Sequence, residues 1–237
     1  MLLIRKILNI DTATMMMTIR HIGFLIFFML FSLISFAQYD FQIWANAEIN
    51  KELTKDLSIS FSEELRLENN ARDANVWFSD IGLNYEINKN IEVAFAYRYI
   101  NEAELNYTSK HHRFYGSLSI NEKINRFQLS YRIRYQQKYS EIFSSEDGKI
   151  PSDDLRNRIK LEYNIRKCKL TPSASYELYY KLNYRDRRFR KAKYTLGVEY
   201  KTTMDHKFGV YYRIEQELNR NSAMIYSIVG ITYAYKF

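Results

Sequence analysis

The sequence predicts an all-β protein: an antiparallel up-and-down transmembrane β-barrel of 10–12 strands that follows a cleaved signal peptide. Three observations predict this fold. Apolar residues recur at every second position through most of residues 41–237, the charges fall almost entirely on the other alternating set, and short turns alternate with longer polar loops. The composition agrees, since 21 Tyr and 15 Phe favour strands, and only 7 Gly and 2 Pro interrupt them.

Composition also excludes several classes of protein. The mean hydropathy is −0.42 and 26% of the residues are charged, whereas each span of a multi-helix membrane protein needs about 20 consecutive apolar residues. The single Cys excludes an intramolecular disulfide framework and an all-Cys zinc site. The formal charge of +8 does not indicate nucleic acid as a partner, because the basic residues are predicted to line the barrel interior.

A secretory signal peptide is predicted at the start of the chain. Arg20 and His21 precede an apolar run over residues 22–34, and small residues stand three and one before the expected cleavage site, at Ser35 and Ala37. We expect cleavage after Ala37, a signal peptide at 1–37 and a barrel at 38–237. An uncleaved membrane anchor is the alternative. We expect translation to start at one of three methionines: Met15, Met16 or Met17.

Eleven segments carry the alternation. They are residues 41–49, 57–67, 77–87, 91–99, 114–120, 127–135, 155–165, 170–182, 192–200, 208–218 and 225–237. Bacterial single-chain barrels normally have an even number of strands. We therefore expect either a twelfth strand hidden near residues 138–154, or ten strands with the first segment outside the wall. The loop lengths place the C-terminus in the periplasm, and the N-terminus at the other end.

The apolar set is predicted to face lipid. Across the last ten segments its only charge is Glu63, and a charge near the bilayer midplane costs roughly 2–4 kcal/mol for Lys or Arg. A soluble barrel would turn this set inward, but about sixty large side chains are too many for one closed interior. Tyr rings suit the membrane interfaces. The interfacial aromatics are predicted to include Tyr97, Tyr99, Tyr135, Tyr163 and Tyr200.

The opposite set is predicted to line the lumen. Its charges are Arg98, Arg113, Arg132, Arg134, Arg156, Arg158, Lys160, Glu162, Glu177, Glu199, Arg213, Glu215 and Glu217. Five of them, Arg132, Arg134, Arg156, Arg158 and Lys160, fall on two adjacent segments, and we call them the basic wall. Opposed charges in a small lumen form either a closed ion-pair network or a narrow pore with a transverse field. We expect a narrow or closed lumen with a weak preference for anions if it conducts.

The last strand carries a predicted assembly signal, an aromatic terminus with apolar residues at alternate positions. Its residues are Val229, Ile231, Tyr233, Tyr235 and Phe237. Such a terminus resembles the signal of outer-membrane proteins that the barrel assembly machinery binds as an added strand. The predicted partners are outer-membrane lipids, periplasmic chaperones and the barrel assembly machinery.

Several strand positions resemble one known family. They are Asp40-Phe41 with Trp44 and Glu48, then Glu64 and Arg66, Gly82 with Tyr85, and Tyr97-Arg98 after the Asn88-Lys89-Asn90 turn. Together they are similar to an uncharacterised bacterial outer-membrane β-barrel family known as domain of unknown function 2490. The resemblance spans most of residues 38–237. It implies the outer membrane of a Gram-negative bacterium and no established activity.

Catalytic chemistry is weakly indicated. Ser109, His111 and His112 stand at the predicted top of the fifth strand, where a lipid-modifying enzyme would carry its polar cluster. No Gly-x-Ser-x-Gly elbow and no metal-spaced His pair accompany them. We therefore predict no catalytic residues, no metal site and no cofactor. Cys168 is expected to be an incidental cysteine in a periplasmic turn.

Three functions stay open at this point. The first is a narrow or closed outer-membrane barrel that passes small anionic solutes. The second is a structural or adhesive barrel whose surface loops bind a partner. The third is a lipid-modifying enzyme. For the second, the loop at 138–154 is acidic and could meet a ligand outside the cell; its acids are Glu141, Glu146, Asp147, Asp153 and Asp154.

Overall fold

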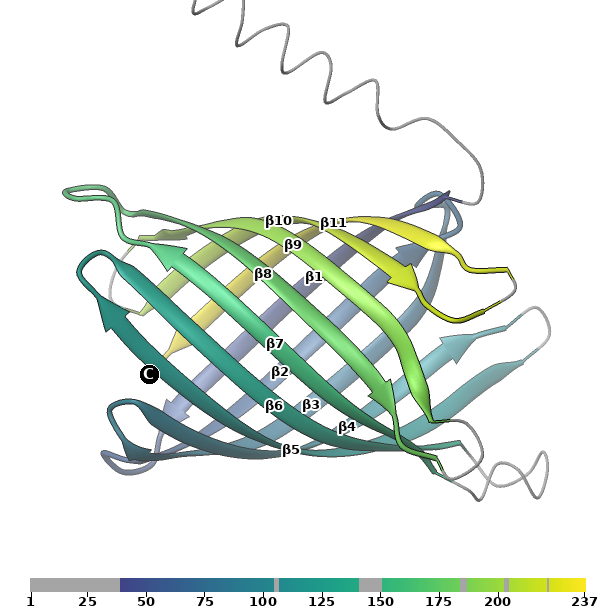
Figure 1. Ribbon diagram of the computed structural model, residues 1–237, viewed down its shortest axis with the longest axis horizontal. Helices are drawn as coiled ribbons and strands as arrows, with labels where there is room; N and C mark the ends of the chain where they lie inside the picture. Colours follow the sequence, from purple (N-terminus) through teal and green to yellow (C-terminus); the bar gives the residue numbers. More distant parts are fainter. Residues whose placement is uncertain (1–38, 105–106, 141–150, 184–186, 203–204, 221) are drawn as a thin grey trace, which may run out of the picture. The chain divides into compact units, whose positions relative to one another are not determined.

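A computed structural model describes residues 39–104, 107–140, 151–183, 187–202, 205–220 and 222–237. The predicted signal peptide therefore lies outside the described residues. Within them the chain is a single closed barrel of tilted strands (Figure 1). Its eleven strands are β1 (Tyr39–Glu52), β2 (Leu57–Glu68), β3 (Asp73–Asn88), β4 (Ile91–Ala103), β5 (Thr108–Ile124), β6 (Phe127–Ser140), β7 (Ser152–Tyr163), β8 (Leu170–Lys181), β9 (Arg188–Lys201), β10 (His206–Glu217) and β11 (Ile225–Lys236).

The expectation of an even strand number is wrong. β1 lies in the wall, where it pairs antiparallel with β2 and parallel with β11. That parallel pair runs in register from Tyr39↔Ile225 to Asn50↔Lys236. An even count is required only when every neighbouring pair is antiparallel, so one parallel junction lets an odd number of strands close. The antiparallel up-and-down order holds for every other pair.

Most strands are longer than the alternation alone indicated, whereas β8 and β11 each end one residue earlier. β5 begins at Thr108 and ends at Ile124, so it includes Ser109, His111 and His112, which the sequence placed at or above the strand top. Two-residue turns join β3 to β4 and β5 to β6. At the second of these, Asn125 adopts φ 55°, a left-handed conformation that Asn tolerates better than most residues.

The two ends of the barrel differ. We call the end with connections 53–56, 89–90, 125–126, 164–169 and 202–205 the turn end; Phe237 also lies there. The other, where β1 starts and the connections are 69–72, 104–107, 141–151, 182–187 and 218–224, we call the loop end. Residues 141–150, with the predicted surface acids Glu141, Glu146 and Asp147, lie outside the described residues. Among the residues described, no helix is long and apolar enough to span a membrane.

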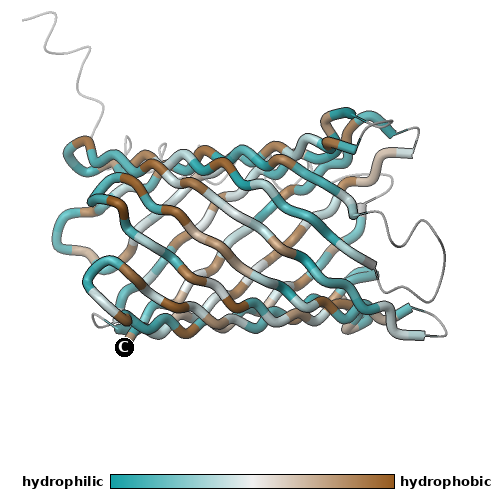
Figure 2. The backbone as a smooth tube through the Cα atoms, turned by 90° about the horizontal axis from the view of Figure 1, so that it is seen from below, coloured by the Kyte–Doolittle hydropathy of each residue, from teal (hydrophilic) through white to brown (hydrophobic). Residues whose placement is uncertain are grey.

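Apolar side chains cover the outside of the barrel. Hydrophobic and hydrophilic segments alternate along the strands (Figure 2), and large side chains of the predicted outward set are freely exposed, for example Phe95 at 69% and Leu196 at 65%. Glu63, the charge on this set, accepts a hydrogen bond from the indole Nε1 of Trp77 at 2.5 Å. The small buried cluster of Val76, Phe78 and Ile100 instead lies on the inward set.

The closing junction can be tested by cross-linking. In a Cys168→Ser background, Asn46→Cys with Thr232→Cys should form a disulfide on mild oxidation, because these residues are direct partners across β1 and β11. Asn46→Cys with Lys236→Cys is the matched control, since its second position lies four residues, or roughly 13 Å, further along β11. Faster migration of the boiled, unreduced protein reports the cross-link. Equal cross-linking of the two pairs, or none in the first, contradicts the parallel junction.

Candidate functional site

The basic wall consists of like charges placed directly opposite each other. Across β6 and β7, Arg132 pairs with Arg158 and Arg134 pairs with Arg156. Alternation along each strand turns all four side chains into the lumen, together with Lys160 on β7. Like charges opposite each other destabilise a sheet, so the fold needs a counter-charge here.

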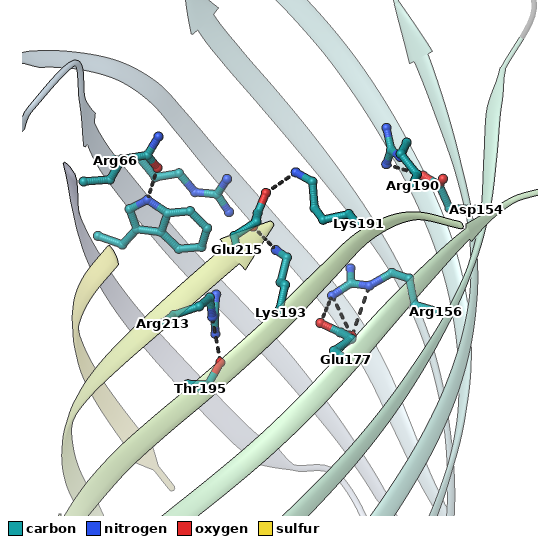
Figure 3. Close-up of polar contacts among 12 residues, drawn as sticks. Arg66, Asp154, Arg156, Glu177, Arg190, Lys191, Lys193, Thr195, Arg213 and Glu215 are labelled. Carbon is teal, nitrogen blue, oxygen red and sulfur yellow. Dashed lines mark hydrogen bonds and ion pairs between the residues drawn. The ribbon is translucent and has the colours of Figure 1, made fainter. Parts of the chain in front are cut away.

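Glu177 on β8 supplies that counter-charge to two of the four arginines. Its Oε1 accepts from Arg132 Nη2 at 2.9 Å, and the Arg156 guanidinium donates to both carboxylate oxygens at 2.9–3.2 Å (Figure 3). The Glu177 side chain is only 9% exposed. Arg156 also donates from Nη1 to Gln136 at 3.1 Å. One buried carboxylate therefore fixes one arginine on each of the two paired strands, β6 and β7.

Three arginines have no such partner. Arg113, Arg134 and Arg158 make no hydrogen bond and no ion pair with any residue that the structure describes. The Nε atoms of Arg113 and Arg134 are buried and unsatisfied, although Arg134 stacks on Tyr115 with its guanidinium carbon 4.1 Å from the ring centroid. The wall of β5, β6 and β7 thus carries uncompensated positive charge toward the lumen.

Several cations on the other strands have carboxylate partners. Glu215 on β10 forms an ion pair with Lys193 at 2.7 Å and accepts a hydrogen bond from Lys191 (Figure 3). Asp80 on β3 pairs with Arg98 and also accepts from the Tyr115 hydroxyl at 3.2 Å. A further pair is Arg66 with Glu64, at 2.6 Å.

Trp44 packs against three cations, two of which, Arg66 and Lys193, belong to these ion pairs. The Arg66 guanidinium lies 3.6 Å from its ring centroid, Arg213 lies at 5.2 Å and Lys193 Nζ at 5.6 Å. Because β10 and β11 lie between β9 and β1 in the wall, a ring on β1 that contacts Lys193 must project into the interior. It is 4% exposed, and cation–π contacts of this kind strengthen when they are desolvated. We call Trp44, Glu64, Asp80, Tyr115, Arg132, Arg134, Arg156, Glu177, Tyr179, Lys193 and Ile228 the lumen belt.

Cavities lie on both sides of the lumen belt. Toward the loop end, cavities of about 770 and 240 Å³ share Arg66, Glu68, Glu102 and Lys191. Toward the turn end, cavities of about 440 and 320 Å³ share Glu48, Asn50, Lys207 and Ala234. The loop-end and turn-end pairs have no lining residue in common. The loop-end cavities and the turn-end cavities are therefore separate spaces.

The remaining predicted lumen charges lie on either side of the belt. Lys160 contacts Glu162 at 2.9 Å and Glu199 at 3.3 Å. Arg213 donates to the Thr195 hydroxyl at 3.0 Å (Figure 3). Glu217, near the loop end, pairs with Arg220 at 2.8 Å.

Sequence reasoning missed several inward residues. Asp154 was assigned to the surface loop as a candidate ligand residue; this is wrong, because Asp154 lies in β7 and is 1% exposed. It accepts from Gln136 at 3.0 Å and from Arg190 at 2.8 Å (Figure 3). Trp44 and Asp80 were also overlooked as lumen residues. Both lie at even-numbered positions of β1 and β3, where the odd-numbered positions are the apolar, outward set. The same alternation that placed the charged residues inside therefore also predicts an inward position for Trp44 and Asp80.

The candidate catalytic cluster does not form a catalytic triad. His111 faces inward, and its Nε2 contacts both Ser109 Oγ at 3.1 Å and Glu102 at 3.4 Å. A triad needs the nucleophile and the acid on different ring nitrogens, and the other nitrogen, Nδ1, is buried without a partner. His112 faces outward, where Nδ1 is 2.7 Å from the Tyr97 hydroxyl.

The outward aromatics gather near both ends. Toward the loop end, the rings of Tyr97 and Tyr99 pack on His112, with centroids 6.0 and 5.4 Å away. Tyr97 also packs on Phe114, at 5.1 Å. Tyr135 is 43% exposed on the same side of β6. At the turn end, Tyr163 packs on Phe127 at 4.9 Å, and Tyr200 is 42% exposed.

The predicted assembly residues follow the outward face of β11. Tyr233 and Tyr235 pack around His206, and Phe237 stacks on Tyr235 at 5.6 Å. Val229 and Ile231 continue this set toward the loop end. Cys168 is exposed in the connection between β7 and β8, at the turn end. Among the described residues, no group of three or more His, Cys, Asp or Glu side chains is arranged to hold a metal ion.

The shared carboxylate gives a stability prediction. Glu177→Gln should destabilise the barrel by about 3–5 kcal/mol, because it leaves Arg132 and Arg156 charged and uncompensated in a buried site. Glu199→Gln is the control, since Glu199 is 35% exposed and should cost less than about 1 kcal/mol. Guanidinium unfolding in lipid vesicles, followed by Trp fluorescence, measures both. Similar losses in the two variants contradict the assigned role of Glu177.

The chain is similar to one protein family and to several solved structures. No curated protein matches the chain. Among solved structures, a KdgM porin in complex with disordered oligogalacturonate is 14% identical over 75% of this chain and 90% of its own, with a TM-score of 0.44. The β domain of the Bordetella autotransporter BrkA is 9% identical over 71% of this chain and 78% of its own, with a TM-score of 0.43. The family model described as "Protein of unknown function (DUF2490)" matches residues 41–224, and the chain belongs to that family.

Proposed function

We propose that the protein is exported, inserts in the outer membrane of a Gram-negative bacterium and forms a narrow passage that prefers small anionic solutes. The observation that carries this proposal is the basic wall: two directly opposed arginine pairs face the lumen and share one carboxylate. Buried like charges are costly. An anion in the lumen would offset that cost, whereas a cation would add to it.

The apolar outward surface supports the proposed location in a membrane. Exposed Phe, Leu, Ile and Val cover a closed wall, and a contiguous apolar surface of this extent is unfavourable in water. Closure also leaves no sheet edge unpaired in lipid. The clusters of Tyr, Phe and His near the two ends fit the interfaces, where amphipathic rings have one apolar and one hydrated side.

The lumen belt supports a narrow passage. A wide pore would leave its arginines hydrated, yet the Arg132, Arg156 and Glu177 side chains are 14%, 12% and 9% exposed. Solutes must pass between Trp44 and the basic wall. Ion selectivity in such a constriction depends on the charges that line it.

A structural barrel is the second candidate. The separation of the loop-end cavities from the turn-end cavities favours it, because a belt fixed by ion pairs would close the lumen. In that case a partner would bind loops at the loop end. The third possibility, a lipid-modifying enzyme, is disfavoured by the geometry of Ser109 and His111.

Export and assembly belong to the same proposal. We propose cleavage after Ala37, delivery by periplasmic chaperones and insertion by the barrel assembly machinery. The backbone of Phe237 supports a role in closure: its N–H donates to Asn50 at 2.9 Å, and its carbonyl accepts from Glu52 at 3.2 Å. The last residue of the chain is thus tied to the first strand.

Cell fractionation tests the location. The protein should be found in the outer membrane, migrate differently before and after boiling, and begin at Gln38. Deleting Phe237 should lower the folded fraction, because β11 then loses its last bonds to β1. Recovery from the soluble periplasm refutes the membrane assignment, and unchanged insertion of the truncated chain refutes the role of Phe237.

Planar-bilayer recordings test the selectivity. In a KCl gradient, the reversal potential should show chloride to be more permeant than potassium. Arg134→Gln and Arg158→Gln should each lower that preference by about twofold or more, because each removes an unpaired positive charge from the lumen. Arg126→Gln, in an exposed turn outside the lumen, makes the same charge change and should leave the ratio unaltered. Cation selectivity in the unmodified protein contradicts the proposal.

A further inference from the structure

The turn-end cavity of about 440 Å³ is lined by cationic and hydroxylated side chains. It lies on the turn-end side of the lumen belt, against the inward faces of β1 and β7 to β11. Its volume falls within the range of small-molecule sites in proteins, roughly 300–1,000 Å³.

Two arginines enter this cavity without a carboxylate partner. Arg158 makes no hydrogen bond or ion pair among the described residues, and Arg213 donates only to the Thr195 hydroxyl. The faces of Trp44 and Tyr211, at 5.2 and 4.6 Å, hold the Arg213 guanidinium. A fixed guanidinium is well suited to bind a planar or tetrahedral oxyanion through two parallel hydrogen bonds.

The acids in the cavity do not neutralise these arginines. Glu199 is engaged by Lys160 at 3.3 Å, and Glu48 accepts from Asn50 at 2.6 Å. The lining carries four cations, Arg158, Lys160, Lys207 and Arg213, against these two acids. With Glu162, which also contacts Lys160 at 2.9 Å, the acids number three, so a net positive charge is left for a ligand.

The rest of the lining is small and hydroxylated. Ser173, Ser175 and Thr232 present hydroxyls without a partner among the described side chains. Gly209 keeps this region open, since a Cβ there would lie 2.4 Å from the Thr232 hydroxyl. Hydroxyls both donate and accept, so they match a ligand that carries hydroxyl groups of its own.

We propose that this cavity binds a small hydroxylated solute bearing one carboxylate or phosphate group, of the size of a sugar acid or a sugar phosphate. Arg158 and Arg213 hold the oxyanion, and the Ser and Thr hydroxyls hold the body of the solute. The site rests on the proposed function only in that such a solute would enter through this end of the lumen. Its binding is measurable in detergent without any conduction.

Calorimetric titration of the full-length mature protein with gluconate, glucose 6-phosphate and glucose tests the site. Gluconate, glucose 6-phosphate or both should bind, and neutral glucose should not. Arg158→Gln should weaken binding about tenfold or more, because it removes charge-assisted hydrogen bonds. Arg113→Gln, which removes an equally unpaired arginine from a loop-end cavity, should change affinity less than about twofold.

The outcomes separate the two proposals. Heat-modifiable migration shows that each variant is folded, and Arg158→Lys should recover part of the affinity, since it keeps the charge but not the fork. No binding of either anion, or an equal loss in Arg113→Gln, overturns the site even if the bilayer shows anion preference. Binding that depends on Arg158 establishes the site even if the bilayer shows none. Equal binding of glucose overturns the role of the oxyanion.

Discussion

The interior of this barrel depends on the ion pairs that one carboxylate, Glu177, forms with two arginines, Arg132 and Arg156. Strands β6 and β7 place four arginines in two directly opposed pairs, and Glu177 on β8 contacts Arg132 and Arg156 at once. Without it, the sheet would hold like charges face to face in a poorly hydrated space. With it, two arginines are fixed and the unpaired ones, such as Arg134 and Arg158, present their charge to the lumen.

The rest of the interior is arranged around this wall. Trp44 reaches from β1 toward Lys193 and stacks on Arg66, so cation–π contacts add to the ion pairs that these cations form with Glu215 and Glu64. Larger cavities open on either side. A barrel of eleven strands has little room inside, and long side chains fill most of it at the level of the belt. The charge pattern and the constriction are thus two consequences of the same set of inward residues.

Much of the fold could be predicted from sequence because period-two alternation is a direct consequence of strand geometry. The apolar alternating set lacks charged residues except Glu63, and this absence of charge identified the outward face. The strand number could not be predicted, because nothing in the local pattern distinguishes a parallel from an antiparallel closing pair. The position of Asp154 was missed for a similar reason: its acidic neighbours in the sequence are typical of a loop, while its partners Gln136 and Arg190 come from other strands.

The pairing of charges was equally beyond the sequence. Alternation places Arg132, Arg134, Arg156 and Arg158 on one face, but only the register between β6 and β7 decides that they oppose each other. A shift of two residues would have left the same composition with different partners. Which arginines are left unpaired, and therefore free for an anion, follows from that register and from the reach of Glu177.

The central claim is that one face of this sheet lies against lipid while the other lines a positively charged lumen. Two adjacent small residues of β8 test it most directly: Ser175, which lines the turn-end cavity beside Lys160, and Ala174, which faces outward. In a Cys168→Ser background in lipid vesicles, Ser175→Cys should react with an anionic methanethiosulfonate faster than with a cationic one, and Ala174→Cys with neither. Reaction of Ala174→Cys at a similar rate, or faster reaction of Ser175→Cys with the cationic reagent, would contradict the account.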